Sequence, residues 1–353
     1  MAAKPHVIVV GAGIIGASIA WHLARDGARV TVVAEDNGGV ATPCSFAWIN
    51  ASWGNPEFYY RFRCRSMAEW KRLAGELPGL PLEWCGSLSW DLPPERLEAF
   101  ISQHGAWGYG IERVDGDAIR KREPHLADHP DQAVVVAEEG AVEPVATARM
   151  MLADAETRGA TVIDAAVRGL LRTGERISGV VTSAGVIEAD HVVLASGAGT
   201  APLTASIGIT LPIKTPAGLI VHSRPHARRL NGLVMAPELH MRQTADGRII
   251  AGSDFGGAQP GEDQHATAEA LFEKVRAALT ESQPLAMDFF TVGYRPTPKD
   301  GFPMIGDVCD GLYIAVMHSG VTLAPLAGML ASNEILRGES DPMLAPFRPT
   351  RFL

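Results

Sequence analysis

The 353-residue sequence has few cysteines, fewer basic than acidic side chains, and no apolar run long enough to span a bilayer. Its four cysteines are widely spaced without a C-x-x-C pair, which excludes a disulfide scaffold and indicates reduced thiols. The formal net charge of −9 argues against non-specific binding of nucleic acid. The apolar segment 7–20 is interrupted by glycines and is shorter than the roughly 20 residues of a membrane helix. We therefore expect a soluble cytoplasmic protein with no membrane or nucleic-acid partner.

The first 35 residues follow the order strand, glycine-rich turn, helix and strand. Residues 7–10 are apolar and β-branched, as in a strand that is buried on both faces. A G-x-G-x-x-G turn follows directly and contains Ile14 and Ile15. Residues 17–26 then show helical spacing, and residues 28–34 resume a β-branched run. This order predicts a βαβ unit.

The glycines of this turn have distinct physical roles. Gly11 permits the tight turn, Gly13 lets backbone N–H groups approach a pyrophosphate, and Gly16 lets the helix pack close to the strand. The helix N-terminus favours the phosphate charge. Between a strand and a helix, the turn predicts dinucleotide binding. Glu35, after the second strand, is the candidate ligand of the ribose hydroxyls; the alternative is an exposed turn acid.

The rest of the chain alternates between helical and strand-like segments. Helices are predicted at 58–77, 146–158, 267–282 and 322–336, and strands at 160–163, 167–171, 177–181, 190–195 and 312–316. Residues 217–251 alternate short apolar runs with turn signals, which is typical of antiparallel sheet. With 46% hydrophobic residues, the chain is predicted to form a mixed α/β protein of about two domains.

Four C-terminal segments carry a family resemblance. They are Gly-Tyr-Arg-Pro at 293–296, Asp-Gly-Phe-Pro-Met-Ile-Gly at 300–306, Gly-Leu-Tyr-Ile-Ala at 311–315 and His-Ser-Gly-Val-Thr-Leu-Ala-Pro at 318–325. In this order they resemble the D-amino-acid oxidase superfamily of FAD-dependent oxidoreductases, and within it the glycine oxidase and sarcosine oxidase branch. Val-Glu-Pro at 142–144 falls where the family has a similar segment. The resemblance implies that the dinucleotide is FAD, which the glycine turn alone does not decide.

The resemblance also implies which residues contact FAD. The loop 42–50 would border the pyrophosphate and the flavin, Val167 would contact the adenine, and the segment 318–323 would follow the pyrimidine edge of the flavin. Beside residues 11–16 and Glu35, the cofactor-binding residues implied in this way are Thr42, Pro43, Cys44, Ser45, Val167, Gly197, Arg295, His318, Ser319, Gly320, Val321, Thr322 and Leu323. We expect non-covalent attachment, because residues 297–299 lack the cysteine that the sarcosine oxidase type uses.

Three residues are predicted to act on the substrate. Arg295 matches the family arginine that holds a substrate carboxylate, and a guanidinium fork suits a planar carboxylate. His240 and Arg242 stand where relatives have an aromatic residue and an arginine. His240 either faces the substrate or is solvated or hydrogen-bonded. Trp48 and Trp53 either line the substrate pocket or belong to the core.

The chain departs from the family pattern at two places. The family acid that binds the ribose stands where this chain has Ala34, so Glu35 would reach in from the next position. The family segment after the histidine often has two more residues, sometimes with a second carboxylate-binding arginine. Here Gly320 is followed directly by Val321, so that arginine is absent or is supplied elsewhere.

Two histidine pairs have a spacing that could bind zinc from one helix face. They are His125 with His129, and His222 with His226. Prolines flank the first pair and interrupt the second, so neither is expected on a helix. No metal site is therefore expected.

These observations predict an FAD-dependent oxidase of a small primary or secondary amine that bears a carboxylate: glycine, an N-substituted glycine or a D-amino acid. Hydride transfer to the flavin, hydrolysis of the imine and reoxidation by molecular oxygen would give hydrogen peroxide. The alternatives are a dehydrogenase that passes electrons to a quinone or a partner protein, an NAD-dependent dehydrogenase, and a non-catalytic FAD-binding subunit. The sequence is compatible with a homo-oligomer.

The predicted architecture has two parts. A discontinuous Rossmann-like FAD-binding domain would comprise residues 1–75, 140–212 and 288–353. A substrate-binding domain built on an antiparallel β-sheet would comprise residues 76–139 and 213–287.

Overall fold

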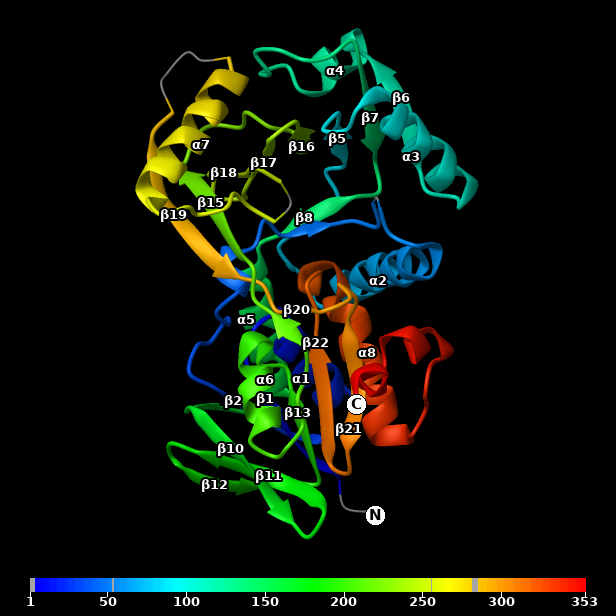
Figure 1. Cartoon of the computed structure of the whole chain (residues 1–353), viewed down its shortest axis with the longest axis vertical. Coiled ribbons are helices and arrows are strands. Elements are labelled where there is room, and N and C mark those ends of the chain that lie inside the picture. The colour runs from blue at the N-terminus through cyan, green and yellow to red at the C-terminus, as the bar shows by residue number, and fades with distance from the viewer. Residues whose placement is uncertain (1–3, 53, 255, 281–284) are drawn as a thin grey trace.

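The computed structural model describes residues 4–52, 54–254, 256–280 and 285–353, and two large sheets dominate these ranges (Figure 1). The lower sheet in Figure 1 has six strands in the order β21-β22-β13-β1-β2-β9. They are β1 (His6–Val10), β2 (Arg29–Ala34), β9 (Thr161–Asp164), β13 (His191–Leu194), β21 (Met304–Cys309) and β22 (Leu312–Val316). All neighbours are parallel except β21 and β22. The loops that follow the parallel strands therefore gather at one carboxyl edge.

Both faces of this sheet are covered, as its β-branched strands predict. Val7 and Val9 pack toward α1 (Ile14–Arg25), and Ile8 and Val10 pack on the opposite side with the core of β11. Next to α1 lie α5 (Pro144–Thr157) and α8 (Gly320–Arg337). The other face carries β10 (Val167–Thr173), β11 (Arg176–Thr182), β12 (Gly185–Glu188), η2 (Gly197–Gly199) and α6 (Thr200–Ala205).

The upper sheet in Figure 1 has eight strands in the order β19-β15-β18-β17-β16-β5-β7-β6. They are β5 (Ser87–Ser89), β6 (Ile111–Asp115), β7 (Gln132–Val136), β15 (Ala217–Ser223), β16 (Leu233–Ala236), β17 (Leu239–Gln243), β18 (Ile249–Gly252) and β19 (Met287–Tyr294). Neighbours are antiparallel except β5 and β16. α7 (Gln264–Ala278) covers one face, and α3 (Pro94–Ala106) and α4 (Gly116–Arg122) lie near β6. On the other face Ile220, Met235 and Ile250 pack with Phe46.

Short elements join the two large sheets. The strands β3 (Trp48–Ile49), β8 (Gly140–Val142) and β4 (Leu82–Glu83) form a small sheet between them, and α2 (Glu57–Glu76) lies against α8 (Figure 1). The remaining elements are η1 (Thr42–Cys44), β14 (Ile213–Lys214), β20 (Thr297–Pro298), η3 (Pro342–Phe347) and η4 (Pro349–Phe352). The carboxyl edge of the six-stranded sheet faces this junction.

The predicted mixed α/β architecture is confirmed, with three differences in detail. The helix predicted at 267–282 is α7 and ends at Ala278; residues 281–282 lie outside the described residues. The helices α3 and α4 were not predicted. The predicted domain boundary at residue 288 is misplaced, because β19 pairs along its length with β15 and so belongs to the eight-stranded sheet.

Two further observations concern the whole of the described chain. No helix in the described ranges combines the length and apolar character needed to cross a membrane. All four cysteines carry free thiols.

Candidate functional site

The glycine turn, residues 11–16, lies at the carboxyl edge between β1 and α1. Gly11 has a φ of +103°, which favours glycine, and a Cβ there would lie 2.6 Å from a backbone oxygen of the neighbouring strand end. A Cβ on Gly16 would collide with the carbonyl oxygen of Gly11. Gly13, at the N-cap of α1, has no side chain to cap the helix, and the Ile14 N–H donates to Thr42 Oγ1 at 3.1 Å. This backbone geometry suits a phosphate at the helix N-terminus.

The loop 42–50 passes between the glycine turn and the eight-stranded sheet. A Cβ on Gly293 of β19 would lie 2.5 Å from Cys44 Cβ, so the strand approaches the loop closely. Burial raises the pKa of the Cys44 thiol, which favours the protonated form. Ser45 Oγ accepts a hydrogen bond from the Ala47 N–H at 3.0 Å, and Pro43 is exposed. Cys44 therefore packs against β19, and the contact with FAD that the resemblance implies for it stays a prediction.

Three of the predicted cofactor residues follow parallel strands and therefore share the carboxyl edge. Glu35 follows β2 and is exposed, Val167 begins β10 shortly after β9, and Gly197 follows β13 with a φ of +56°. β2 and β9 are adjacent, with Ala34 paired to Asp164. The adenosine-side roles of these three residues stay predictions.

Arg295 follows β19 and is partly buried where the two large sheets meet. Its backbone N–H donates to the carbonyl of Pro216 at 3.1 Å. A Cβ on Gly256 would collide with Nη1, so glycine at this position leaves room for the guanidinium. The buried Nε has no hydrogen-bond partner among the described residues. Burial lowers the pKa of Arg295, and the negative charge of Asp254 opposes this effect. A guanidinium with an unpaired buried donor suits a carboxylate ligand.

His318 lies within electrostatic range of two arginines. Burial and the positive charges of Arg295 and Arg63 lower the pKa of His318 to about 4, so its imidazole is neutral at physiological pH. Its Nδ1 lies 3.4 Å from the Ser319 hydroxyl. The arrangement concentrates positive charge at this point of the carboxyl edge.

The first turn of α8 lies beside the glycine turn. A Cβ on Gly320 would lie 3.4 Å from Ile15 Cγ1, which is ordinary van der Waals contact. Val321, Thr322 and Leu323 are buried, and the Thr322 hydroxyl donates to a carbonyl of β3 at 3.1 Å. The helices α1 and α8 therefore begin side by side at one edge, next to the loop 42–50.

Sequence reasoning missed a buried arginine beside this helix start. Arg63 of α2 is 6% exposed. Its Nη1 donates to Ser319 Oγ at 2.6 Å. Its Nε donates to the backbone oxygen of Asn50 at 3.0 Å, and its Nη2 donates to the side-chain oxygen of Asn50 at 2.7 Å. Ser66 and Trp70 donate to backbone carbonyls in the first turn of α8. The i, i+3, i+7 spacing of Arg63, Ser66 and Trp70 was the available signal. The structure thus supplies an arginine next to the shortened segment after His318.

A buried carboxylate, also missed, holds the loop that contains β3. Glu139 accepts hydrogen bonds from Trp48 Nε1 at 2.8 Å and from the hydroxyls of Ser52 and Tyr109. Complete burial raises the pKa of Glu139, and these hydrogen bonds oppose that effect. Trp48 therefore has a structural hydrogen bond, whereas Trp53 lies outside the described residues.

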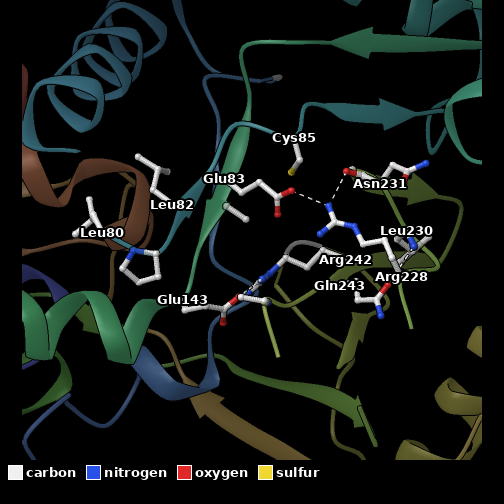
Figure 2. Close-up of a pocket in the computed structure, with 14 residues that line it drawn as sticks. Leu80, Leu82, Glu83, Cys85, Glu143, Arg228, Leu230, Asn231, Arg242 and Gln243 are labelled. Atoms are coloured by element: carbon white, nitrogen blue, oxygen red, sulfur yellow. Dashed lines mark hydrogen bonds and ion pairs between the residues drawn. The ribbon is translucent and has the colours of Figure 1, made fainter. Parts of the chain in front are cut away.

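The surroundings of Arg242 do not fit the catalytic role predicted for it. Its Nε donates to the carbonyl of Phe46 at 2.6 Å, Nη1 contacts the Glu143 carboxylate at 3.0 Å, and Nη2 lies 3.3 Å from the carbonyl of Val142. Arg242 lines a cavity of about 160 Å³. Figure 2 shows it near the ion pair between Arg228 and Glu83, which line the same cavity. Since every guanidinium nitrogen has a partner within the chain, we assign Arg242 a structural role instead.

His240 lies on the same face of β17 as Arg242 but in different surroundings. The residue is 3% exposed, its Nε2 lies 3.1 Å from Asp91 Oδ2, and its buried Nδ1 has no partner among the described residues. His240 is therefore hydrogen-bonded, and its predicted contact with the substrate stays a prediction. The same residue lines a larger cavity of about 520 Å³, together with Asp91, Ser253 and Asp254. Asp254, which lines this cavity, also acts electrostatically on Arg295.

Within the described ranges, His, Cys, Asp and Glu side chains form no group of three that could hold a metal ion. The site is therefore built from glycine backbone, helix N-termini, two arginines and a neutral histidine.

Comparison with known proteins adds three findings. The model of the DAO family, described as FAD dependent oxidoreductase, matches residues 6–334. A glycine oxidase of Pseudomonas aeruginosa is 29% identical over 368 aligned positions, with 97% of this chain and 98% of the relative covered. A crystal structure of L-proline dehydrogenase from P. horikoshii superposes with a TM-score of 0.86 at 25% identity, covering 100% of this chain and 98% of that one. An iminodiacetate oxidase from Chelativorans sp. has a TM-score of 0.85 at 26% identity, covering 97% and 98%.

Proposed function

Since this chain belongs to the DAO family of FAD-dependent oxidoreductases, we propose that it oxidises a small primary or secondary amine bearing a carboxylate. The proposed substrates are glycine, an N-substituted glycine or a D-amino acid. The observation that carries this proposal is Arg295, a partly buried guanidinium whose Nε has no partner among the described residues. Similarity to a glycine oxidase and to an iminodiacetate oxidase supports the same class of substrate.

The residues at the carboxyl edge fit FAD. The glycine turn and the N-terminus of α1 would hold the pyrophosphate, and the loop 42–50 and the first turn of α8 would border the flavin. We propose non-covalent binding, because the one cysteine of that loop, Cys44, packs against Gly293. When bound, FAD supplies the hydride acceptor and then the electron donor to molecular oxygen.

The chain itself would bind and orient the amine. Arg295 would fix the carboxylate and so hold the α-carbon in one place, which supplies the alignment that hydride removal needs. The neutral His318 adds no positive charge that would repel an amine. Loss of the α-hydrogen as hydride and of a proton from nitrogen leaves an imine, which water hydrolyses to a carbonyl compound and an amine or ammonia. The product pair therefore identifies the substrate class.

A dehydrogenase on the same fold is the second candidate. The likeness to L-proline dehydrogenase, at 25% identity over the whole chain, favours it. Such an enzyme would reduce a quinone or a partner protein instead of oxygen. The two functions share the amine half-reaction and differ only in how the electrons leave.

The test is a visible spectrum of the purified protein followed by anaerobic titration with glycine, sarcosine, longer N-alkylglycines and D-amino acids. We expect a flavin band that one of these classes bleaches. Admitting air should restore the band and release hydrogen peroxide; an oxidase does so within turnover times, and a dehydrogenase does not. A flavin that none of these amines reduces would contradict the proposal and favour a non-catalytic FAD-binding subunit.

A further inference from the structure

We propose that Arg63 is a positioning residue for the bound cofactor, which acts through Ser319 to stabilise negative charge on the pyrimidine ring of the flavin and so raises its reduction potential. The proposal rests on FAD binding and does not depend on which amine is the substrate. Three observations carry it: the surroundings of Arg63, the orientation that it imposes on Ser319, and the place where both residues lie.

The first observation is that Arg63 is a buried cation surrounded by neutral groups. Its hydrogen-bond acceptors are the Asn50 oxygens, the Ser319 hydroxyl and, at 3.5 Å, the Tyr59 hydroxyl, while the Tyr59 ring lies 5.4 Å from Cζ. No carboxylate of the described residues forms an ion pair with it. By contrast, Arg242, which is equally buried, pairs with Glu143. A buried charge is costly unless an opposite charge is near, so Arg63 is arranged to meet an anion that the chain itself does not provide.

The second observation concerns Ser319, the N-cap residue of α8. A serine at this position normally accepts a hydrogen bond from an N–H of its own helix. Here Ser319 makes no such bond; its Oγ accepts from Arg63 at 2.6 Å instead. Two consequences follow. The first-turn N–H groups of α8 keep their capacity to donate, and the Ser319 hydroxyl proton can be donated either to His318 Nδ1, at a long 3.4 Å, or to an acceptor on the cofactor. A charged donor on its oxygen makes this hydroxyl a stronger donor.

The third observation is the location. Ser319 precedes a helix whose first residue lies next to Ile15 of the glycine turn, at the edge proposed to bind the dinucleotide. The α8 N-terminus, the Ser319 hydroxyl and the Arg63 charge all favour negative charge at this point. Ser66 and Trp70 donate to carbonyls of the same turn, so side chains of α2 hold this turn in place. Reduced flavin carries its negative charge on the pyrimidine ring, and the arrangement therefore favours the reduced state.

The experiment uses the FAD-loaded protein and two measurements that need no amine: the midpoint potential of the bound flavin and the Kd of sulfite. Sulfite adds to flavin N5 through its sulfur lone pair and places negative charge on the pyrimidine ring, so its affinity reports stabilisation of that charge. The variants are Arg63→Gln, Arg63→Lys and Ser319→Ala. Arg61→Gln is the matched control, because Arg61 lies on the same helix, is exposed and pairs with Glu57.

We expect Arg63→Gln to weaken sulfite binding at least tenfold and to lower the midpoint potential. Arg63→Lys, which keeps the charge, should recover most of the affinity, Ser319→Ala should weaken it several-fold, and Arg61→Gln should match the parent. A merely structural role would lower the unfolding temperature of Arg63→Gln and leave both flavin measurements unchanged, which would overturn the proposal. If Arg63→Gln does not retain FAD, the Ser319→Ala variant tests the proposal in its place. A sulfite Kd of Ser319→Ala within twofold of the parental value would then refute the proposal. Failure of every amine to reduce the flavin would contradict the proposed function without touching this result.

Discussion

Arg242 and Arg63 have nearly the same exposure, 3% and 6%, but their surroundings differ in kind. Arg242 lies where the loop 42–50 meets β17, and there its charge is met by the carboxylate of Glu143. Arg63 lies where α2 meets α8, and there only neutral oxygens receive its hydrogen bonds. Arg295 differs from both, because the negative charge of Asp254 acts on it and its buried Nε has no hydrogen-bond partner among the described residues. A buried arginine that is paired with a carboxylate joins two parts of the fold. A buried arginine without a carboxylate partner marks a place that binds an anion from outside the chain.

The strongest test of this comparison is Arg295→Ala. If Arg295 holds the substrate carboxylate, its removal should lower kcat/KM at least 100-fold, or about 3 kcal/mol, because a charge-assisted contact is lost. The flavin spectrum and FAD content should stay unchanged, and Arg295→Lys should retain part of the activity. Steady-state kinetics at low substrate concentration measure the effect. Parental turnover under these conditions would remove Arg295 as the carboxylate anchor.

Arg242→Met tests the buried arginine that is paired with a carboxylate. Loss of the guanidinium leaves Glu143 without its partner and two carbonyls without a donor, so the free energy of unfolding should fall by about 2–3 kcal/mol. Urea unfolding followed by tryptophan fluorescence measures this change. The double variant with Glu143→Gln should recover part of the loss, and the sulfite Kd should stay at the parental value. A large change in the flavin measurements with parental stability would reverse our assignment.

His222 provides a pH-dependent test of the same region. Burial and the charges of Arg242 and Arg248 lower the pKa of His222 to about 4, against about 6.5 in an unfolded chain. Between these values the unfolded state binds a proton that the folded state does not bind, so the free energy of unfolding falls as the pH falls. His222→Gln removes this contribution, and between pH 7 and pH 5 the variant should lose about 2 kcal/mol less than the parent. Parallel pH profiles of the two proteins would contradict the lowered pKa.

The smallest effect is expected for the ion pair between Arg228 and Glu83, which line the same cavity as Arg242. Both side chains are about half exposed, and their nearest nitrogen and oxygen atoms are 2.7 Å apart. Because water screens such pairs, Arg228→Ala should change the free energy of unfolding by less than about 1 kcal/mol. The same urea experiment at low and high salt measures it. A loss in the free energy of unfolding as large as that of Arg242→Met would show that the exposure of an ion pair does not determine its contribution to stability.

Features encoded by local patterns could be predicted from the sequence. The strands β1 and β2, the glycine turn and the helices α2, α5 and α8 follow from hydrophobic spacing and glycine positions. A role for Arg295 could be proposed because the residue belongs to a recognisable segment, and that role stays a prediction. Arg63 could not, since an arginine in a helix of mixed polarity normally faces water, and its partner Ser319 is 256 residues away in the chain. The same limit applies to Arg242, whose partner Glu143 is 99 residues away.

The contact between α1 and α8 has a consequence for how the protein is made. The Ser18 hydroxyl of α1 donates to the carbonyl of Ala324 in α8 at 2.7 Å, across 306 residues of chain. During synthesis α1 leaves the ribosome first, and the helix that covers it emerges only after about 300 further residues have been translated. The apolar face of the first βαβ unit must therefore stay uncovered during that interval, in which chaperones bind such surfaces. A premature stop codon that removes α8 would leave that face permanently open, so the truncated product should aggregate or be degraded rather than fold into a smaller working enzyme.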